Sequence, residues 1–222
     1  PLKRVSKLDL NKHLVQLKYN GHRCLVTKHE GDIIAYSRQG KLIDTIPHIL
    51  ENIDIPEGYT LDGELYCHGQ SLQTIASWAK RAQADTTRLV YIVYDVISDE
   101  GYSDRLHWLL DQEFWNTNVL LAPTSFLDKE LTEQLRLAKV DQYEGLILRN
   151  TKGGYQAGRR SSFLVKVKSC MDAEYPVVDV IPSKKNWGVL VCMLPSGDTF
   201  KTSAPGTIDQ KEEVLQNKEK YI

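Results

Sequence analysis

The sequence predicts an α+β fold with two domains, residues 1–169 and 170–222. In the first part, short runs of alternating apolar and polar residues end at glycine-containing turns, and segments with helical apolar spacing lie between them. In the second part, three short strand patterns and one helix pattern follow within about fifty residues, as in a small β-barrel of the oligonucleotide-binding (OB) type. We therefore expect antiparallel sheets with flanking helices, followed by a small barrel.

The composition is typical of a soluble globular protein, with 41% hydrophobic and 26% charged residues among 222. No apolar run is long enough to cross a membrane and no leader-like segment starts the chain, so we expect a cytoplasmic protein with no membrane partner. A formal net charge of -1 means that any polyanion would have to bind locally gathered positive charge. Without metal-ligand spacing, the four cysteines are expected to be reduced core thiols: Cys24, Cys67, Cys170 and Cys192.

Strand and helix patterns divide the chain. Strands are predicted at residues 14–17, 24–26, 33–36, 59–66, 89–97, 143–149, 163–168, 173–181, 189–194 and 199–203. Helices are predicted at residues 43–50, 72–79, 106–114, 131–138 and 207–218, with possible caps at Ser71, Ser103 and Thr207. Residues 151–162 form a loop rich in glycine, arginine and serine.

Residues 18–23, KYNGHR, lie between two apolar runs and indicate a strand, a sharp turn and a second strand. Gly21 allows a conformation or a close approach that is closed to other residues. Lys18 then stands at the end of a buried strand, and a lysine held there can act as a nucleophile when its amine is neutral. Taken alone, a lysine beside a glycine turn is more often a solvated hairpin tip, so the rest of the chain has to decide.

Polar residues recur at the ends of the most apolar strand patterns. Each of them has an ordinary structural explanation when taken singly, such as a turn carboxylate or a solvated lysine face. Because unpaired charge on core strands is costly, we expect these groups to converge on each other or on a polar ligand. The groups are Lys18/Arg23, Asp62/Glu64, Tyr94/Asp95, Glu144/Arg149 and Lys166/Lys168.

In this order, the motifs closely resemble those of the covalent nucleotidyltransferase superfamily, which contains ATP-dependent DNA ligases, RNA ligases and mRNA capping enzymes. The resemblance covers residues 16–168 almost continuously, and it is strongest for a minimal, bacteriophage-type ATP-dependent DNA ligase. Any single motif is weak evidence, whereas six in order are strong. They are KYNGHR, YSRQG, LDGEL, VYIVYDVI, EGLILR and LVKVK.

The resemblance implies an ATP-grasp-like nucleotidyltransferase domain over residues 1–169 and an OB-fold domain over residues 170–222, the latter expected to be incomplete at its C-terminus. It implies a DNA ligase that seals nicks through a lysine-AMP intermediate on Lys18, with Lys166 and Lys168 as further catalytic residues. It also implies magnesium or manganese at Glu144 and Glu64. The implied ATP and AMP contacts are Gln16, Leu17, Lys18, Arg23, Glu64, Tyr94, Lys166 and Lys168.

The implied partner is nicked double-stranded DNA, bound by a monomer in the cytoplasm, or in the host cytoplasm if the protein is viral. Positively charged side chains would contact phosphates of the DNA backbone. A solvated turn explains each loop arginine nearly as well when it is taken singly. The candidate DNA contacts are Ser37, Arg38, Lys152, Arg159, Arg160, Lys184 and Lys185.

Two departures from the family pattern leave alternatives open. Asn20 replaces the usual aspartate of the nucleophile motif, and no segment matches the sixth, C-terminal motif. The first alternative is an RNA ligase, or with less support a capping guanylyltransferase, although LDGEL and the GRRSS–LVKVK segment have the DNA-ligase form. The second is a nick- or nucleotide-binding protein whose turnover Asn20 impairs.

Overall fold

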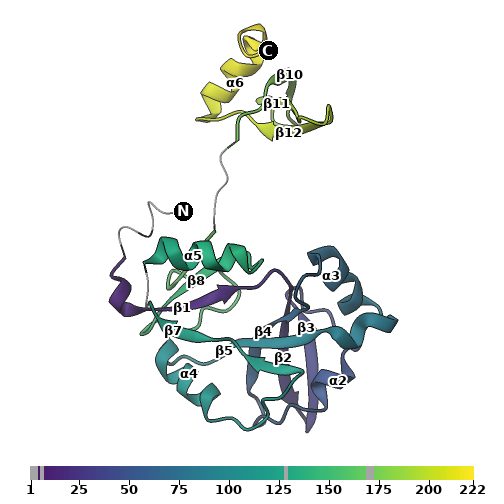
Figure 1. The fold of residues 1–222 in the computed structure, drawn as a ribbon, viewed down its shortest axis with the longest axis vertical. Coiled ribbons are helices and arrows are strands. Elements are labelled where there is room, and N and C mark those ends of the chain that lie inside the picture. Colours follow the sequence, from purple (N-terminus) through teal and green to yellow (C-terminus); the bar gives the residue numbers. More distant parts are fainter. Residues whose placement is uncertain (1–4, 6–7, 128–129, 169–172) are drawn as a thin grey trace. The chain divides into compact units, whose positions relative to one another are not determined.

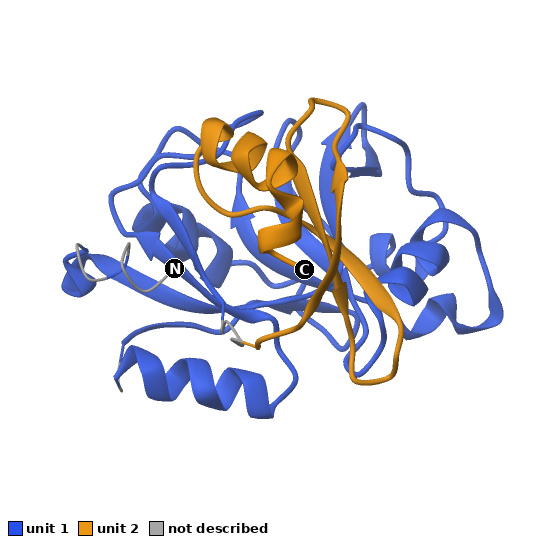
Figure 2. Ribbon diagram, turned by 90° about the horizontal axis from the view of Figure 1, so that it is seen from above, with its two compact units in different colours: residues 1–169 blue, residues 170–222 orange. Residues whose placement is uncertain are grey.

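The structure is a computed structural model that describes residue 5 and residues 8–127, 130–168 and 173–222. The chain divides into two compact units, residues Pro1–Ser169 and Cys170–Ile222 (Figure 2). Over the described residues, no helix has the length and apolar character needed to cross a membrane. Cys24, Cys67 and Cys192 are free and buried, whereas Cys170 lies outside the described residues.

A four-stranded antiparallel sheet in unit 1 carries Lys18 at the end of one strand. Its order is β7-β1-β8-β9. Helix α5 covers one face through a cluster of Val, Leu and Ala side chains (Figure 1). The elements are η1 (Leu10–Lys12), β1 (His13–Lys18), β7 (Thr124–Phe126), α5 (Leu131–Val140), β8 (Gly145–Asn150) and β9 (Leu164–Val167).

The five-stranded sheet of unit 1 has the order β3-β2-β4-β5-β6. The β5–β6 pair is parallel, which corrects the expectation of wholly antiparallel sheets. Residues of α2, α3 and α4 share the larger hydrophobic core with this sheet. The elements are β2 (His22–His29), β3 (Asp32–Ser37), α2 (Pro47–Leu50), β4 (Thr60–Tyr66), α3 (Leu72–Lys80), η2 (Ala84–Arg88), β5 (Val90–Val96), α4 (Tyr102–Leu110) and β6 (Val119–Leu121).

Helices α3 and α5 start where the sequence predicts, whereas the starts of α2 and α4 differ. Ser71 caps α3 by accepting a hydrogen bond from the Thr74 N–H at 3.1 Å, as predicted. Helix α2 is shorter than predicted, because Pro47, which has no N–H and a fixed φ, occupies its first turn. Gly101, without a capping side chain, precedes α4, and Ser103 lies inside the helix instead of capping it.

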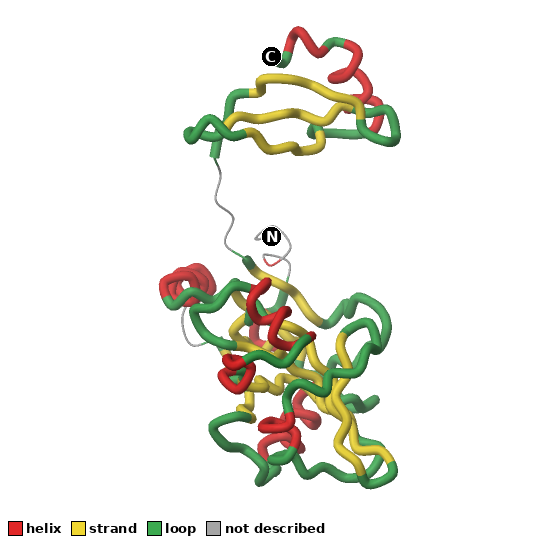
Figure 3. The backbone as a smooth tube through the Cα atoms, turned by 90° about the vertical axis from the view of Figure 1, so that its right-hand side faces the viewer, coloured by secondary structure: helices red, strands yellow, loops and turns green. Residues whose placement is uncertain are grey.

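Unit 2 contains a three-stranded antiparallel sheet of order β10-β11-β12 and a helix, α6 (Figure 3). Thr207 and Gln210 form the predicted capping box at the start of α6. The described residues show an open sheet, whereas a barrel needs its edge strands to be paired. The OB-type barrel therefore stays a prediction. The elements are β10 (Val177–Pro182), β11 (Gly188–Met193), β12 (Thr199–Ser203), α6 (Ile208–Gln216) and η3 (Lys218–Lys220).

Alternation along β1 separates apolar from polar side chains. Val15 and Leu17 pack in the cluster beneath α5, so Gln16 and Lys18 point to the opposite face of the four-stranded sheet. In β2, Cys24 lies in the larger core, which turns Arg23 to the other face of the five-stranded sheet. The polar groups of both sheets therefore lie on the faces opposite these two apolar clusters.

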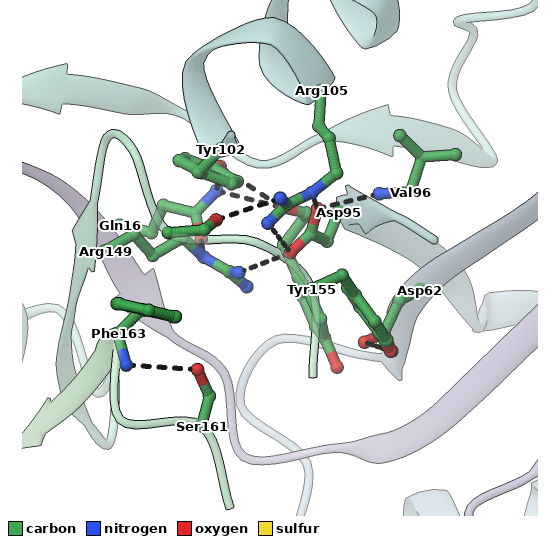
Figure 4. Close-up of polar contacts among 12 residues, drawn as sticks. Gln16, Asp62, Asp95, Val96, Tyr102, Arg105, Arg149, Tyr155, Ser161 and Phe163 are labelled. Carbon is green, nitrogen blue, oxygen red and sulfur yellow. Dashed lines mark hydrogen bonds and ion pairs between the residues drawn. The ribbon is translucent and has the colours of Figure 1, made fainter. Parts of the chain in front are cut away.

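A buried polar network joins the two sheets of unit 1 (Figure 4). Asp95 of β5 accepts hydrogen bonds from Arg105 of α4 at 2.7 and 3.2 Å and from Arg149 of β8 at 2.7 Å. Arg149 also donates to the Gln16 side-chain oxygen of β1 at 2.6 Å. All four residues are 7% exposed or less, so each polar group depends on its partners in place of water.

Replacing Asp95 with asparagine should lower the free energy of unfolding by about 3–5 kcal/mol, because two buried guanidinium groups would lose their only anionic partner in this network. Urea unfolding measures this loss. The matched control is Asp54→Asn, which breaks an ion pair with Lys28 in which the Asp54 side chain is 91% exposed; it should change stability by less than about 0.5 kcal/mol. Equal losses in both variants would contradict the role given to the network.

Candidate functional site

Gly21 fixes the turn that follows Lys18. A Cβ atom at this position would collide with the Leu65 carbonyl oxygen and with the Glu64 side chain of β4. The absence of a side chain lets the turn pack directly on β4, where the Gly21 N–H favours the charged form of the Glu64 carboxylate. The turn predicted from KYNGHR is confirmed, and it brings Glu64 close to the strand that carries Lys18.

The Lys18 ammonium contacts the carboxylate of Glu144, whose other oxygen contacts Lys168. The Glu144 N–H also donates to the Lys18 carbonyl oxygen at 3.0 Å, which holds the two residues together through the backbone. Burial raises the pKa of Glu144, but the hydrogen bonds from Lys168 and Lys18 outweigh it and hold the pKa below its usual value. A single carboxylate thus bridges two amines.

Lys166 belongs to the same group of cations. It lies on β9 opposite Ile147, and its side chain is exposed beside the Lys18 and Lys168 charges. Burial lowers the pKa of Lys166, and the charges of Lys18, Arg38 and Lys168 lower it further. Three lysines predicted to be catalytic therefore gather at one place, together with one arginine predicted to contact DNA.

Glu64 is the second carboxylate near Lys18. Burial raises the pKa of Glu64 to about 7, although the Lys18 charge and the Gly21 N–H act in the opposite direction. Its carboxyl group therefore changes protonation near neutral pH, far above the range of a solvated glutamate.

Arg23 forms a bidentate ion pair with Asp62 across the neighbouring strands β2 and β4. Its Nε and Nη2 donate to the two Asp62 oxygens at 2.8 and 2.7 Å. The Tyr155 hydroxyl donates to Asp62 at 2.8 Å and accepts from Arg23 at 3.0 Å. Asp62 is 4% exposed, whereas the Arg23 side chain is 38% exposed, so the carboxylate is shielded from water while the guanidinium remains partly accessible.

The residues expected to hold the adenine lie beside the buried network. The Gln16 amide donates to the Tyr102 hydroxyl at 2.7 Å and to the Thr124 hydroxyl at 2.8 Å, and its side-chain oxygen accepts from Arg149. Internal partners therefore engage both ends of this side chain. Tyr94 is partly buried, with the Arg149 guanidinium 5.2 Å from its ring centroid. Leu17 is partly buried and packs against the cluster under α5.

The residues predicted to contact DNA differ in exposure. Ser37 is 5% exposed, and its hydroxyl accepts a hydrogen bond from the Lys41 N–H at 3.1 Å, so it stabilises the turn instead of facing solvent. The other six are exposed, four of them in unit 1 and two in unit 2: Arg38, Lys152, Arg159, Arg160, Lys184 and Lys185.

Sequence reasoning missed Arg105 and the contact of Tyr155. Arg105 is 3% exposed and lies on the apolar stripe of α4 with Tyr102 and Leu109. The available signal was its position, three residues after Tyr102 and four before Leu109, where a charge demands a buried partner. Asn20, the departure from the family motif, is exposed.

A hard divalent cation fits this site through two carboxylates. Within the described ranges, no group of three or more metal-ligating side chains occurs. Magnesium commonly uses one or two carboxylates and completes its shell with water and phosphate oxygens. Glu144, which contacts Lys18, and Glu64, whose pKa the Lys18 charge lowers, are carboxylates of this kind.

The raised pKa of Glu64 has a measurable effect on stability. Folded Glu64 binds a proton up to about pH 7, whereas the usual value is 4.5, so wild-type stability should fall as pH rises between these values. Glu64→Gln cannot titrate, so its stability relative to wild type should rise by roughly 1–3 kcal/mol between pH 5 and pH 8.5. Urea unfolding of both proteins at the two pH values tests this, and a constant difference would contradict it.

Comparison with known proteins supports the resemblance seen in the motifs. Residues 2–168 match the family model described as ATP dependent DNA ligase domain. A DNA ligase of African swine fever virus (isolate Pig/Kenya/KEN-50/1950) is 34% identical over 209 residues, which cover 84% of this chain and 50% of the viral protein. The chain thus spans about half the length of these viral relatives.

Solved structures show the same fold. A structure from an analysis of Lig E DNA ligases has a TM-score of 0.73 and 22% identity, covering 95% of this chain and 84% of that one. The Chlorella virus DNA ligase-adenylate has a TM-score of 0.58 and 22% identity, covering 95% and 82%. These structures agree in fold, and the match of the family model over residues 2–168 shows that the chain belongs to the ATP-dependent DNA ligase family.

Proposed function

We propose that this chain is an ATP-dependent DNA ligase that seals nicks in duplex DNA through AMP carried on Lys18. The observation that supports this most is the convergence of Lys18, Lys166 and Lys168 with Glu144 and Glu64 at one site. Nothing in a purely structural role requires so many charges around one strand end. Nucleotidyl transfer does require them, because negative charge must be held on the transferred phosphate.

In the first step, the neutral Lys18 amine attacks the α-phosphate of ATP in line. A nitrogen–phosphorus bond forms, the bond to the bridging oxygen breaks, pyrophosphate leaves and the amine loses a proton. Lys166 and Lys168 would stabilise the charge that builds up on the phosphate oxygens. The contact of Lys168 with Glu144 keeps this second lysine beside the reacting amine.

Arg23, Glu64 and Tyr94 would bind the nucleoside, with the first two at the ribose and the tyrosine ring on adenine. Leu17 precedes Lys18 on the strand, but its side chain packs under α5 on the opposite face of the sheet, so any contact of Leu17 with the base would come from its backbone. Gln16 would support the nucleotide site indirectly, since its side chain already binds Arg149 and Tyr102. We also assign a magnesium or manganese ion to Glu144 and Glu64, where it would neutralise phosphate charge.

In the following steps, AMP passes to the 5′-phosphate of a nick, and the neighbouring 3′-hydroxyl displaces it. Unit 1 would be the adenylyltransferase domain and unit 2 an OB-type domain, acting together as a monomer on nicked DNA. Arg38 is our candidate for the nick phosphate, because its charge acts on Lys166 beside the nucleophile. Further backbone contacts would come from Lys152, Arg159, Arg160, Lys184 and Lys185.

Lys18→Ala should abolish covalent labelling of the protein by α-labelled ATP and magnesium, because the only proposed nucleophile is lost. The readout is label that stays with the denatured chain. The matched control is Lys28→Ala, since Lys28 lies on β2 and pairs with the exposed Asp54; this variant should label like wild type. Persistent labelling of Lys18→Ala would refute the nucleophile assignment.

Adding nicked substrates to the labelled wild-type protein separates the alternatives. Transfer of label to a DNA nick, followed by sealing, is expected for a DNA ligase. Faster sealing of a matched RNA nick would favour an RNA ligase. Label from GTP in place of ATP would favour a capping enzyme, and no label from either nucleotide would favour a binding protein impaired by Asn20.

Replacing Arg159 and Arg160 with glutamine should weaken binding to nicked DNA and flatten its dependence on salt. Each phosphate contact that is lost should reduce the slope of log K against log salt by about 0.9. Binding measured over a series of salt concentrations tests this. The control is Arg136→Gln, which removes an exposed arginine of α5 that pairs with Glu133. Its slope of log K against log salt should equal that of wild type. A slope equal to that of wild type would make the two loop arginines ordinary solvated residues.

A further inference from the structure

The segment of residues 151–162, between β8 and β9, carries positive charge, and a hydrogen bond from the Ser162 N–H to the Gln156 side-chain oxygen at 2.9 Å closes the part that holds its arginines. It contains Lys152, Arg159 and Arg160, no acidic residue, and glycines at three positions. Residues 157–160 are all exposed. Glycines and repelling charges raise the entropy cost of holding such a segment in one conformation. It therefore needs anchors if its arginines are to meet a ligand in a defined place.

Tyr155 supplies the one side-chain anchor that reaches from this segment to the nucleotide site. Its hydroxyl donates to Asp62 at 2.8 Å (Figure 4). It also accepts a hydrogen bond from Arg23 at 3.0 Å. Burial raises the pKa of Tyr155 well above its usual value, so the hydroxyl keeps the proton that it donates at neutral pH. Asp62 and Arg23 belong to adjacent central strands, which makes them a rigid attachment point.

A second anchor acts on the backbone of the same segment. Arg105 of the buried network donates to the Gly153 carbonyl oxygen at 3.0 Å, and its guanidinium carbon lies 5.8 Å from the Tyr155 ring centroid. The first half of the segment is therefore fixed, and the exposed arginines follow it directly. The ring of Tyr155 contacts Arg105, whereas the hydroxyl alone reaches Asp62 and Arg23, so the two contributions can be separated by removing one oxygen atom.

We infer that Tyr155 is a positioning residue whose hydroxyl ties the arginine-bearing segment to the Arg23–Asp62 pair, so that Arg159 and Arg160 are presented to nicked DNA in register with the nucleotide site. This inference rests on the proposed function. Tyr155 then contributes to DNA binding only through the two arginines and makes no contact with DNA itself.

A double-mutant cycle tests this coupling, with wild type, Tyr155→Phe, the R159Q/R160Q variant and the combined variant. Each is titrated with a nicked duplex that lacks the 3′-hydroxyl, so that no sealing occurs. Tyr155→Phe should weaken binding roughly tenfold. The combined variant should bind within about twofold of R159Q/R160Q, because the hydroxyl acts through the arginines. Independent losses that multiply, or wild-type binding by Tyr155→Phe, would overturn the inference.

Limited trypsin digestion tests the tie without DNA. Tyr155→Phe should be cleaved faster after Arg159 and Arg160, with no change after the buried Arg105 and Arg149, whose cleavage reports global unfolding. The matched control is Tyr59→Phe, a tyrosine 38% exposed that stacks on Trp108; it should digest like wild type. Unchanged cleavage after Arg159 and Arg160 in Tyr155→Phe would overturn only the role given to the Tyr155 hydroxyl. Wild-type protein that neither takes up label from ATP nor binds nicked DNA would overturn the proposed function.

Discussion

The ion pairs of Asp95 with Arg105 and Arg149 are the interaction on which the arrangement of unit 1 depends. They connect β5 of the five-stranded sheet with β8 of the four-stranded sheet and with helix α4. Because all three side chains are buried, each charge is tolerated only while the two sheets stay together. Gln16 extends the network to β1, two residues before Lys18. The position of Lys18 against the other sheet therefore follows from contacts made deeper in the protein.

Around Lys18, the balance of charge is unusual because one carboxylate serves two amines. Glu144 contacts both Lys18 and Lys168, and Lys166 adds a further positive charge nearby. Glu64 approaches from β4, and burial keeps its pKa near neutrality. An excess of positive charge suits the polyphosphate that we propose binds here, and it would explain why these polar residues occur on otherwise apolar strands.

An aromatic cluster closes the same region at the outer end of the strands. The Tyr19 ring, next to Lys18, makes edge contacts with Tyr66 and Tyr143 at centroid distances of 5.1 and 5.6 Å. Tyr143 directly precedes Glu144, so the residues beside both partners of the ion pair are packed together. The buried polar network and this aromatic cluster thus fix Lys18 and Glu144 from two sides, which restricts the geometries that the site can adopt.

The sequence by itself determined which motifs lie on strands and their order along the chain, the turn at Gly21 and the capping of α3 and α6. It also determined the family, because all of these depend on local spacing and residue type. It also indicated that the polar groups on apolar strands would converge. Only the tertiary structure decided the partners. Arg105, to which the sequence analysis gave no role, binds Asp95 and the Gly153 carbonyl oxygen. The Gln16 side chain binds Arg149, and the Ser37 hydroxyl accepts a hydrogen bond within its own turn. The partners of buried charges come from segments far apart in sequence, so periodicity and motif spacing cannot predict them.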